Sequence, residues 1–485
     1  MKLRELLQDV AAAAMTADPE TEIGGVSYDS RTVRPGDLFV AISGYECDGH
    51  RFIPAAAAAG AAAVVCETPP EGDVPYVQVK NSREALALVS AAWFGYPARA
   101  LRVIGVTGTS GKTTTTVLLK QVLEKSLGAK VGLIGTNANV IGEQEEPSER
   151  STPESYQLQK LFRRMADAGC TYVVMEVTSH ALVLDRVAGI RFAAAVYTNL
   201  SQDHLDFHGT MEAYAEAKSR LFSRCDRAVI NLDDGWSRFM TDHADCPVLT
   251  CSIDRNEADL VAKDVKLLPD RVKFCAVTIG DIQRVELKIP GRFSVYNALS
   301  VLGCAMSLGV PLESAAAALA GAHGVKGRVE SVPTDGDYTI LIDYSHKPDA
   351  LDNVLRTVRE SAPGRVVAVF GCGGDRDRTK RPVMGKIATE LADFTIVTSD
   401  NPRTEDPEEI IREIAAGCTG GKKRFITITD RVQAIEYAIE NHRPGDVIVL
   451  AGKGHETYQE INHVKHHLDE REVVAEILER RRNRK

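Results

Sequence analysis

Residues 105–114 read Gly-Val-Thr-Gly-Thr-Ser-Gly-Lys-Thr-Thr, between an apolar run of strand length and a segment with helical spacing. Glycines let successive backbone N–H groups turn inward around a phosphate, and the start of a helix adds its dipole. The spacing departs from G-x-x-x-x-G-K-[ST], because Val106 stands where the first glycine belongs. A Gly/Thr-rich turn before a helix is the alternative, but the G-K-T-T ending favours nucleotide binding. The predicted ATP-binding residues of this loop are Gly108, Thr109, Ser110, Gly111, Lys112, Thr113 and Thr114.

Around this loop, short apolar runs alternate with helical segments. This alternation predicts an α/β fold with a mostly parallel central sheet flanked by helices. Alternating residues over 260–289 favour antiparallel hairpins at the edge of that sheet. The apolar runs that we interpret as central strands are Leu101–Val106, Val131–Ile134, Tyr172–Glu176, Ala194–Tyr197 and Arg227–Ile230.

The length of the chain predicts about three domains, since 485 residues are present and a domain has roughly 150. We expect a small N-terminal α/β domain over residues 1–97 and the central P-loop-type domain over 98–327. A second strand and helix alternation predicts a Rossmann-like α/β domain over 328–485.

Composition excludes several classes of protein. Hydrophobic residues make up 44% and charged residues 26%, which is typical of a globular chain, and the net charge of −9 argues against bulk binding of nucleic acid. The ten cysteines form no C-x-x-C pair and suit a reducing compartment. The acidic residues in the first fifteen positions exclude a signal peptide and favour an amphipathic helix. We therefore expect a cytoplasmic protein with no membrane segment.

Two further clusters follow the loop. Glu176 ends an apolar run, where its carboxylate suits a Mg²⁺ ion, although an acid in this place is more often solvated. The segment Asn199–Gly209 holds two histidines and two aspartates, which suits a metal site, a phosphate site or a capped loop. Lys218 lies on the next helix, where a lysine is usually solvated. Near a cation site, however, its amine can lose its proton and react with CO₂ to give a carbamate.

The central part of the chain contains four motifs in this order: T-G-T-x-G-K-T-T, E-V-x-S-H, N-L-x-x-D-H-L-D-x-H-G and A-K-x-x-L-F. With these motifs the chain resembles the Mur ligases, which are ATP-dependent amide-forming enzymes of peptidoglycan synthesis. Near the start of the chain, Tyr28-Asp-Ser-Arg31 followed by Pro35–Phe39 resembles the uridine-binding region of the family. With the later motifs, the resemblance runs from about residue 28 to residue 456. The later motifs are Gly327-Arg-Val-Glu330, Asp343-Tyr-Ser-His-Lys-Pro-Asp349, Gly371–Asp377, Asp400-Asn-Pro-Arg403 and Gly452-Lys-Gly-His-Glu456. One departure is Ser294, where the family often has asparagine, which leaves Asn297 as the better adenine contact.

Asp400-Asn-Pro-Arg403 resembles the branch of the family that adds meso-diaminopimelate rather than lysine. Diaminopimelate carries a second carboxylate on its distal carbon, and a guanidinium is the natural bidentate partner of a carboxylate. A lysine substrate would place an ammonium against Arg403, which disfavours it. Alone, the segment would suggest only an Asx-Pro turn.

The resemblance implies a full set of roles. The substrates are ATP, UDP-N-acetylmuramoyl-L-alanyl-D-glutamate and meso-diaminopimelate, and the reaction passes through an acyl phosphate. The cofactors are Mg²⁺ and a carbamylated Lys218, and a monomer is expected. Catalysis is assigned to Lys112, Glu176, His204 and Lys218, and metal binding to Thr113, Glu176, His204 and Lys218. ATP also contacts Asn297, Arg328 and Asp343; the muramoyl-peptide contacts Ser30, Thr152, Pro153, Ser179 and Arg186; diaminopimelate contacts Arg376, Asp400, Asn401, Arg403, Gly452 and Glu456.

Three other interpretations of the function remain. Folylpolyglutamate synthetases share the phosphate loop and the ligase chemistry, but the D-N-P-R and N-terminal motifs speak against them. A P-loop transport or signalling ATPase, or a nucleotide-binding module without catalysis, leaves the histidine cluster and Lys218 without a role.

Overall fold

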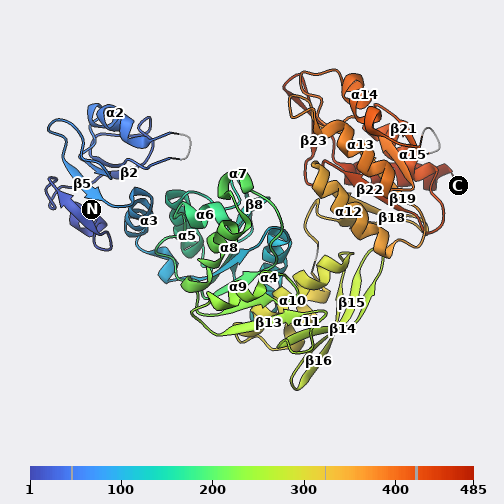
Figure 1. The fold of residues 1–485 in the computed structure, drawn as a ribbon, viewed down its shortest axis with the longest axis horizontal. Helices are drawn as coiled ribbons and strands as arrows, with labels where there is room; N and C mark the ends of the chain where they lie inside the picture. Colours follow the sequence, from blue (N-terminus) through green and yellow to red (C-terminus); the bar gives the residue numbers. More distant parts are fainter. Residues whose placement is uncertain (45–46, 323, 421–423, 485) are drawn as a thin grey trace. The chain divides into compact units, whose positions relative to one another are not determined.

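The structure is a computed structural model that describes residues 1–44, 47–322, 324–420 and 424–484 (Figure 1). Its contacts divide the chain into two compact units. The first comprises Met1–Leu260 with Ser300–Ala315, and the second comprises Val261–Leu299 with Ala316–Lys485.

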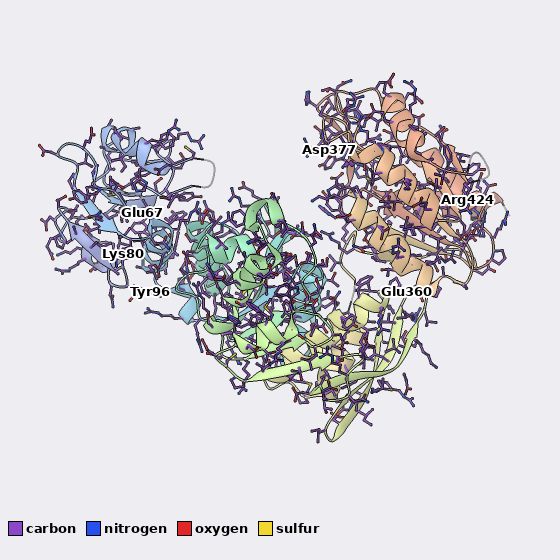
Figure 2. All side chains as sticks on the ribbon, in the orientation of Figure 1. Glu67, Lys80, Tyr96, Glu360, Asp377 and Arg424 are labelled. Carbon is purple, nitrogen blue, oxygen red and sulfur yellow. The ribbon has the colours of Figure 1, made fainter. Side chains whose placement is uncertain are left out.

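The first unit begins with a small sheet in the order β1-β5-β4-β3-β2, in which only β1 is antiparallel to its neighbour. The valines and leucines of its strands pack against α3, whose Ala85, Leu86 and Val89 are buried. Figure 2 labels Tyr96, just beyond the end of α3. The elements are α1 (Leu3–Leu6), β1 (Ala12–Met15), β2 (Gly25–Ser27), β3 (Asp37–Val40), α2 (Ile53–Ala58), β4 (Ala63–Cys66), β5 (Tyr76–Val79) and α3 (Ser82–Trp93).

The helix predicted over the first fifteen residues was wrong beyond its first turn. Helix α1 covers only Leu3–Leu6, and Ala12–Met15 form the edge strand β1. Alanine favours a helix by only a few tenths of a kcal/mol over most residues. Pairing with β5 supplies the strand with cross-strand hydrogen bonds, and this tertiary contact decides the conformation.

The larger sheet of the first unit carries the phosphate loop. Its strands run in the order β13-β12-β11-β6-β10-β7-β8-β9 and are parallel from β13 to β7. The hairpin β8–β9, which is not among the predicted strands and whose second strand is polar, adds antiparallel to β7. The strands are β6 (Arg102–Thr107), β7 (Val131–Ile134), β8 (Ala138–Ile141), β9 (Gln144–Pro147), β10 (Tyr172–Glu176), β11 (Ala194–Tyr197), β12 (Ala228–Asn231) and β13 (Val248–Ser252). The helices are α4 (Lys112–Leu127), α5 (Ser155–Asp167), α6 (Ser179–Val183), α7 (Leu205–His208), α8 (Met211–Ser219) and α9 (Ser237–Asp242).

This sheet places the motifs at one edge. The carboxyl ends of adjacent parallel strands meet there, which is where open α/β sheets bind their ligands. Strand β6 leads into the phosphate loop, β10 ends at Glu176, and β11 leads to Asn199.

The second unit contains the predicted antiparallel strands and a second α/β sheet. Strands β14, β15 and β16 pair antiparallel, as the alternation over 260–289 predicts. The second sheet has the order β17-β18-β22-β19-β20-β21 and is parallel except for β17. Helices α12, α13 and α14 cover one face and α15 and α16 the other, so both faces are buried. The helices are α10 (Arg292–Ser307, shared between the units), α11 (Leu312–Ala320, also shared), α12 (Pro348–Ser361), α13 (Lys380–Leu391), α14 (Pro407–Gly417), α15 (Arg431–Glu440) and α16 (Glu470–Arg484). The strands are β14 (Leu260–Leu267), β15 (Val272–Thr278), β16 (Asp281–Leu287), β17 (Glu330–Val332), β18 (Thr339–Asp343), β19 (Val366–Phe370), β20 (Phe394–Val397), β21 (Phe425–Thr427), β22 (Val447–Ala451), β23 (Tyr458–Ile461) and β24 (Val464–His467).

Within the described residues, no helix has the length and apolar content needed to cross a bilayer.

Candidate functional site

The phosphate loop is held by the segment that follows β11. Gly108 has a φ of 152°, and a Cβ there would lie 1.9 Å from Oγ1 of Thr198, so only glycine fits. The side-chain oxygen of Asn199 accepts a hydrogen bond from the Ser110 N–H at 3.0 Å, and its amide donates to the Ser110 carbonyl at 3.2 Å. These contacts fix the loop before any ligand binds.

Lys112 opens helix α4 and folds back over the loop. Its Nζ donates to the carbonyl oxygens of Gly108 and Thr109 at 2.8 and 2.9 Å. Thr113 and Thr114 complete the first turn of the helix. The ammonium therefore lies beside a helix N-terminus, a combination that attracts an anion.

Glu176 is buried, with 1% of its surface exposed, and three donors hold its carboxylate. Oε1 accepts from the Thr113 hydroxyl at 2.9 Å and from the Thr136 N–H at 2.8 Å, and Oε2 accepts from the Thr136 hydroxyl at 3.0 Å. A carboxylate beside a hydroxyl is a pair of hard oxygen ligands, which fits Mg²⁺. A Cβ on Gly135 would lie 2.8 Å from Oε1, so glycine keeps this space open.

Lys218 is buried on α8, with 1% of its surface exposed. Its Nζ donates to the Gly108 carbonyl at 2.9 Å and lies 4.5 Å from the centre of the Tyr214 ring. Burial, and after it the charge of Lys112, hold the pKa of Lys218 well below the usual lysine range, against a smaller opposing effect of Asp203. The structure thus favours the neutral amine, the form that reacts with CO₂.

Three histidines lie near enough to this lysine for its charge to affect each of them. The ring of His180 lies edge-on to His204 at 4.9 Å and to His208 at 5.5 Å, and His208 stacks on Tyr214. Burial lowers the pKa of all three, that of His208 to about 4. His204 therefore presents a neutral imidazole, the form that binds metals. His204 and Lys218 both lie against the Tyr214 ring, whose centre is 6.2 Å from the centre of the His204 ring.

Four of the five residues predicted to bind the muramoyl-peptide lie near Glu176 and the three histidines. The Thr152 hydroxyl donates to the Glu176 carbonyl at 2.9 Å, and Arg186 Nη1 donates to the Thr152 carbonyl at 3.1 Å. Ser179 Oγ lies 2.8 Å from Nε2 of His208. Pro153 lines a cavity of about 400 Å³ together with Tyr28 and Gln157. Ser30 lies elsewhere, in the loop after β2 of the small sheet.

All six residues predicted to bind diaminopimelate line one cavity of about 640 Å³ in the second unit, at the carboxyl ends of β18, β19, β20 and β22. Figure 2 labels Asp377, which also lines it. Gly452 has a φ of 114°, and a Cβ there would lie 2.6 Å from Asp400 Oδ2. The six are Arg376, Asp400, Asn401, Arg403, Gly452 and Glu456.

A buried lysine with no predicted role joins three of these residues. Lys453 Nζ lies 2.8 Å from Asn401 Oδ1, 3.2 Å from Glu456 Oε2 and 3.4 Å from Asp400 Oδ1. The Asn401 amide donates to Glu456 at 2.9 Å. Lys453 thus links the loop after β20 to the loop after β22, and the G-K-G-H-E motif was the available signal for it.

The two arginines of this cavity differ in how they are held. Arg376 is exposed and donates to the Asp375 carbonyl at 3.2 Å. Arg403 donates from Nη1 to the Gly374 carbonyl at 2.7 Å and from Nε to Glu460 at 3.0 Å. Glu460, like Thr136 and Tyr214, lies outside the predicted site residues, and only the tertiary structure brings it there.

Behind the cavity, Arg381 is fully buried and anchors its loops. The guanidinium binds both oxygens of Glu405, at 2.8 and 2.9 Å, and Glu413 at 2.7 Å. Glu405 in turn accepts from the Asp375 N–H at 2.6 Å. The loop after β19 is therefore fastened to the loop after β20.

Replacing Arg381 by methionine should lower the free energy of unfolding by about 2 kcal/mol. This loss is smaller than the loss from breaking a fully buried ion pair, because the carboxylates of Glu405 and Glu413 are partly exposed. Hydrogen bonding to Arg381 lowers the pKa of Glu405 to about 2 from 4.5. This stabilisation is therefore present above about pH 4.5 and lost as pH falls towards 2. Denaturant unfolding between pH 7 and pH 2.5 measures both effects. Arg412→Met, which removes only the exposed pair with Glu409, should change stability by less than about 0.5 kcal/mol; equal losses in both variants would contradict the anchor.

The remaining predicted ATP contacts also lie in the second unit. Asp343 ends β18 and is buried, which raises its pKa, and it accepts from the Val329 and Ser345 N–H groups at 2.8 and 2.9 Å. The guanidinium of Arg328 lies 5.4 Å from the centre of the Tyr344 ring. Asn297 is buried in α10. Arg328 and Asp343 thus meet at the start of the second sheet, whereas the phosphate loop belongs to the first unit.

Comparison with known proteins gives matches to family models and to full-length relatives that together cover most of the chain. Three family models match: the Mur ligase family catalytic domain over residues 22–94, the Mur ligase middle domain over 106–305, and the Mur ligase glutamate ligase domain over 327–454. The UDP-N-acetylmuramoyl-L-alanyl-D-glutamate–2,6-diaminopimelate ligase of Clostridium botulinum is 45% identical over 94% of this chain and 95% of its own. The ligase of that name from Caldanaerobacter subterraneus is 46% identical over 99% of both chains. A solved structure with the same name has a TM-score of 0.77 and 35% identity, covering 99% of both chains.

Proposed function

Because the chain belongs to the Mur ligase family, we propose that it is the ATP-dependent ligase that adds meso-2,6-diaminopimelate to UDP-N-acetylmuramoyl-L-alanyl-D-glutamate in peptidoglycan synthesis. The product is the UDP-muramoyl-tripeptide. The observation that carries this proposal is that Arg403 and Glu456 line the same cavity, which offers one partner for a carboxylate and one for an ammonium.

The reaction is an amide synthesis in two steps. The γ-phosphoryl group of ATP moves to a carboxylate oxygen of the D-glutamate, ADP leaves, and an acyl phosphate forms. The diaminopimelate amine then attacks the carbonyl carbon, loses a proton and expels phosphate. Phosphorylation replaces a poor leaving group with a good one, so one difficult step becomes two easier ones.

In the first unit, Lys112 and the amides of the phosphate loop would bind the terminal phosphates. Thr113 and Glu176 would hold Mg²⁺, which supplies charge stabilisation to the transferring phosphoryl group. Thr152, Pro153, Ser179 and Arg186 would place the muramoyl-peptide carboxylate near them, with Ser30 at the uridine end.

Lys218 and His204 would hold a second Mg²⁺. The low pKa of Lys218 supports a carbamate: the neutral amine attacks CO₂, a C–N bond forms, and one proton is released. The product is an anionic oxygen ligand in place of an amine. The neutral imidazole of His204 would complete this pair of ligands.

In the second unit, Asn297, Arg328 and Asp343 would contact adenine, phosphate and ribose. Arg328 Nε is buried and has no hydrogen-bond partner among the described residues, which leaves it available to an anionic ligand. We assign the nucleotide-sugar substrate to residues 1–97, phosphoryl chemistry to 98–327 and the incoming amino acid to 328–485. Among the described residues no cysteine forms a disulfide, which suits a protein that works in the reducing cytoplasm. We expect it to act as a monomer.

One assay tests the proposed function. Phosphate release from ATP should require both the UDP-muramoyl-dipeptide and meso-diaminopimelate. Lysine should not replace the amino acid, and folate should not replace the dipeptide. Phosphate release with ATP alone would instead indicate a P-loop ATPase, and release with folate would indicate a folylpolyglutamate synthetase.

Replacing Arg403 by alanine should raise the KM for diaminopimelate about 30-fold or more, because a charge-assisted pair with the distal carboxylate is lost. The KM for ATP should change by less than about twofold, since Arg403 lines the cavity assigned to the amino acid. Arg356→Ala, which removes an exposed arginine paired with Asp352 on α12, is the matched control. Equal increases in both KM values for Arg403→Ala would exclude direct contact with the amino acid.

A further inference from the structure

Arg403 has an acidic partner on a separate hairpin. Its Nε donates to Oε2 of Glu460 on β23 at 3.0 Å, and the two side chains are only 19% and 21% exposed. We propose that Glu460 is a positioning residue that holds the Arg403 guanidinium ready for the distal carboxylate of the acceptor amino acid. This inference rests on the proposed function and adds to it a residue that acts through Arg403.

The backbone of the hairpin supports the same arrangement. Arg403 has a φ of 52°, in the left-handed region that side-chain-bearing residues rarely occupy. Its N–H donates to the Glu460 carbonyl at 3.0 Å, and its carbonyl accepts from the Asn462 N–H at 2.8 Å. The Glu460 N–H donates to Asn401 Oδ1 at 2.9 Å. Strand β23 thus holds the turn that carries Arg403 in an uncommon conformation.

The guanidinium keeps donors for a ligand. Glu460 occupies Nε, and the Gly374 carbonyl accepts from Nη1 at 2.7 Å. Among the described residues, the side chain of Arg403 donates hydrogen bonds from Nε and Nη1, and none from Nη2. Since Arg403 lines the cavity, a carboxylate can bind at the Nη end while Glu460 stays in place.

Two consequences follow for selectivity. An arginine side chain that is already ordered loses less conformational entropy when the substrate binds. Glu460 also offsets the charge of Arg403, so repulsion of a lysine ammonium is weaker than for an isolated guanidinium. Discrimination against lysine then depends mainly on the missing carboxylate, which leaves the prepared Nη donors without a partner.

The test compares two variants in the phosphate-release assay. Glu460→Ala should raise the KM for meso-diaminopimelate about tenfold, because Arg403 must be ordered at each binding event. The kcat value and the KM values for ATP and for the UDP-muramoyl-dipeptide should stay within about twofold. Glu460→Gln keeps an oxygen that accepts from Nε, so its KM for diaminopimelate should stay within about threefold of the unmodified chain.

Glu472→Ala is the matched control, because Glu472 bonds His467 on the other strand of the same hairpin. Its KM values should not change, and a tenfold rise there would overturn the proposal. An unchanged KM in Glu460→Ala would also overturn it, as would a lower KM in both Glu460 variants, which would mean that Glu460 competes with the substrate. An equal rise for all three substrates would indicate a general structural role and overturn it too. Failure of the proposed function is distinct, since it appears in the unmodified chain as phosphate release that does not depend on diaminopimelate.

Discussion

Replacing Lys218 by alanine should lower kcat by about 10³-fold, the loss expected when a group that stabilises transition-state charge is removed from a buried site. The side chain is buried beside the phosphate loop, its pKa is strongly lowered, and its Nζ touches the Gly108 carbonyl. If the amine carries a carbamate, alanine removes an anionic metal ligand from the reaction centre. Initial rates at saturating ATP, diaminopimelate and UDP-muramoyl-dipeptide measure the effect.

Two measurements separate the carbamate from a cationic role. The unmodified chain in ¹³C-bicarbonate should show a carbamate carbon signal that Lys218→Ala lacks. A short carboxylate such as formate, small enough for the space left by the side chain, should restore part of the activity of Lys218→Ala, whereas bicarbonate should not. Rescue by methylammonium in place of formate, or near-normal turnover of Lys218→Ala, would contradict the carbamate.

Replacing Lys112 by methionine should lower kcat/KM for ATP by about 10³-fold, because the charge that faces the transferring phosphoryl group is lost while the length of the side chain is kept. The structure places the ammonium over the loop, 2.8 Å from the Gly108 carbonyl and 2.9 Å from that of Thr109. Steady-state rates with varied ATP measure the change.

Lys120→Met provides the control for this substitution. Lys120 lies on the same helix and pairs with Glu124 at 2.7 Å, away from the loop. Its kcat/KM should stay within about twofold of the unmodified chain. If Lys112→Met kept more than a tenth of the activity, the loop would not be the phosphoryl-transfer site.

Much of the fold could be predicted because its strands are buried on both faces. Val131–Ile134, Tyr172–Glu176 and Ala194–Tyr197 read as continuous apolar runs and form β7, β10 and β11 with the predicted bounds. The missed elements lack that signal. Strand β9 contains Gln144 and two glutamates, and β1 consists of three alanines and a methionine, so both exist through pairing with a neighbouring strand.

The candidate site, like the fold, could be predicted only in part. The sequence by itself determined which residues end the strands and open the loops, because phosphate loops and strand-end carboxylates have short, local signatures. Only the tertiary structure decided their partners, such as Thr136 for Glu176, the Gly108 carbonyl for Lys218 and Glu460 for Arg403. The pair Arg403–Glu460 is separated by 57 residues and Thr136–Glu176 by 40. Strand order and the β23–β24 hairpin, rather than spacing along the chain, bring such residues within hydrogen-bond distance.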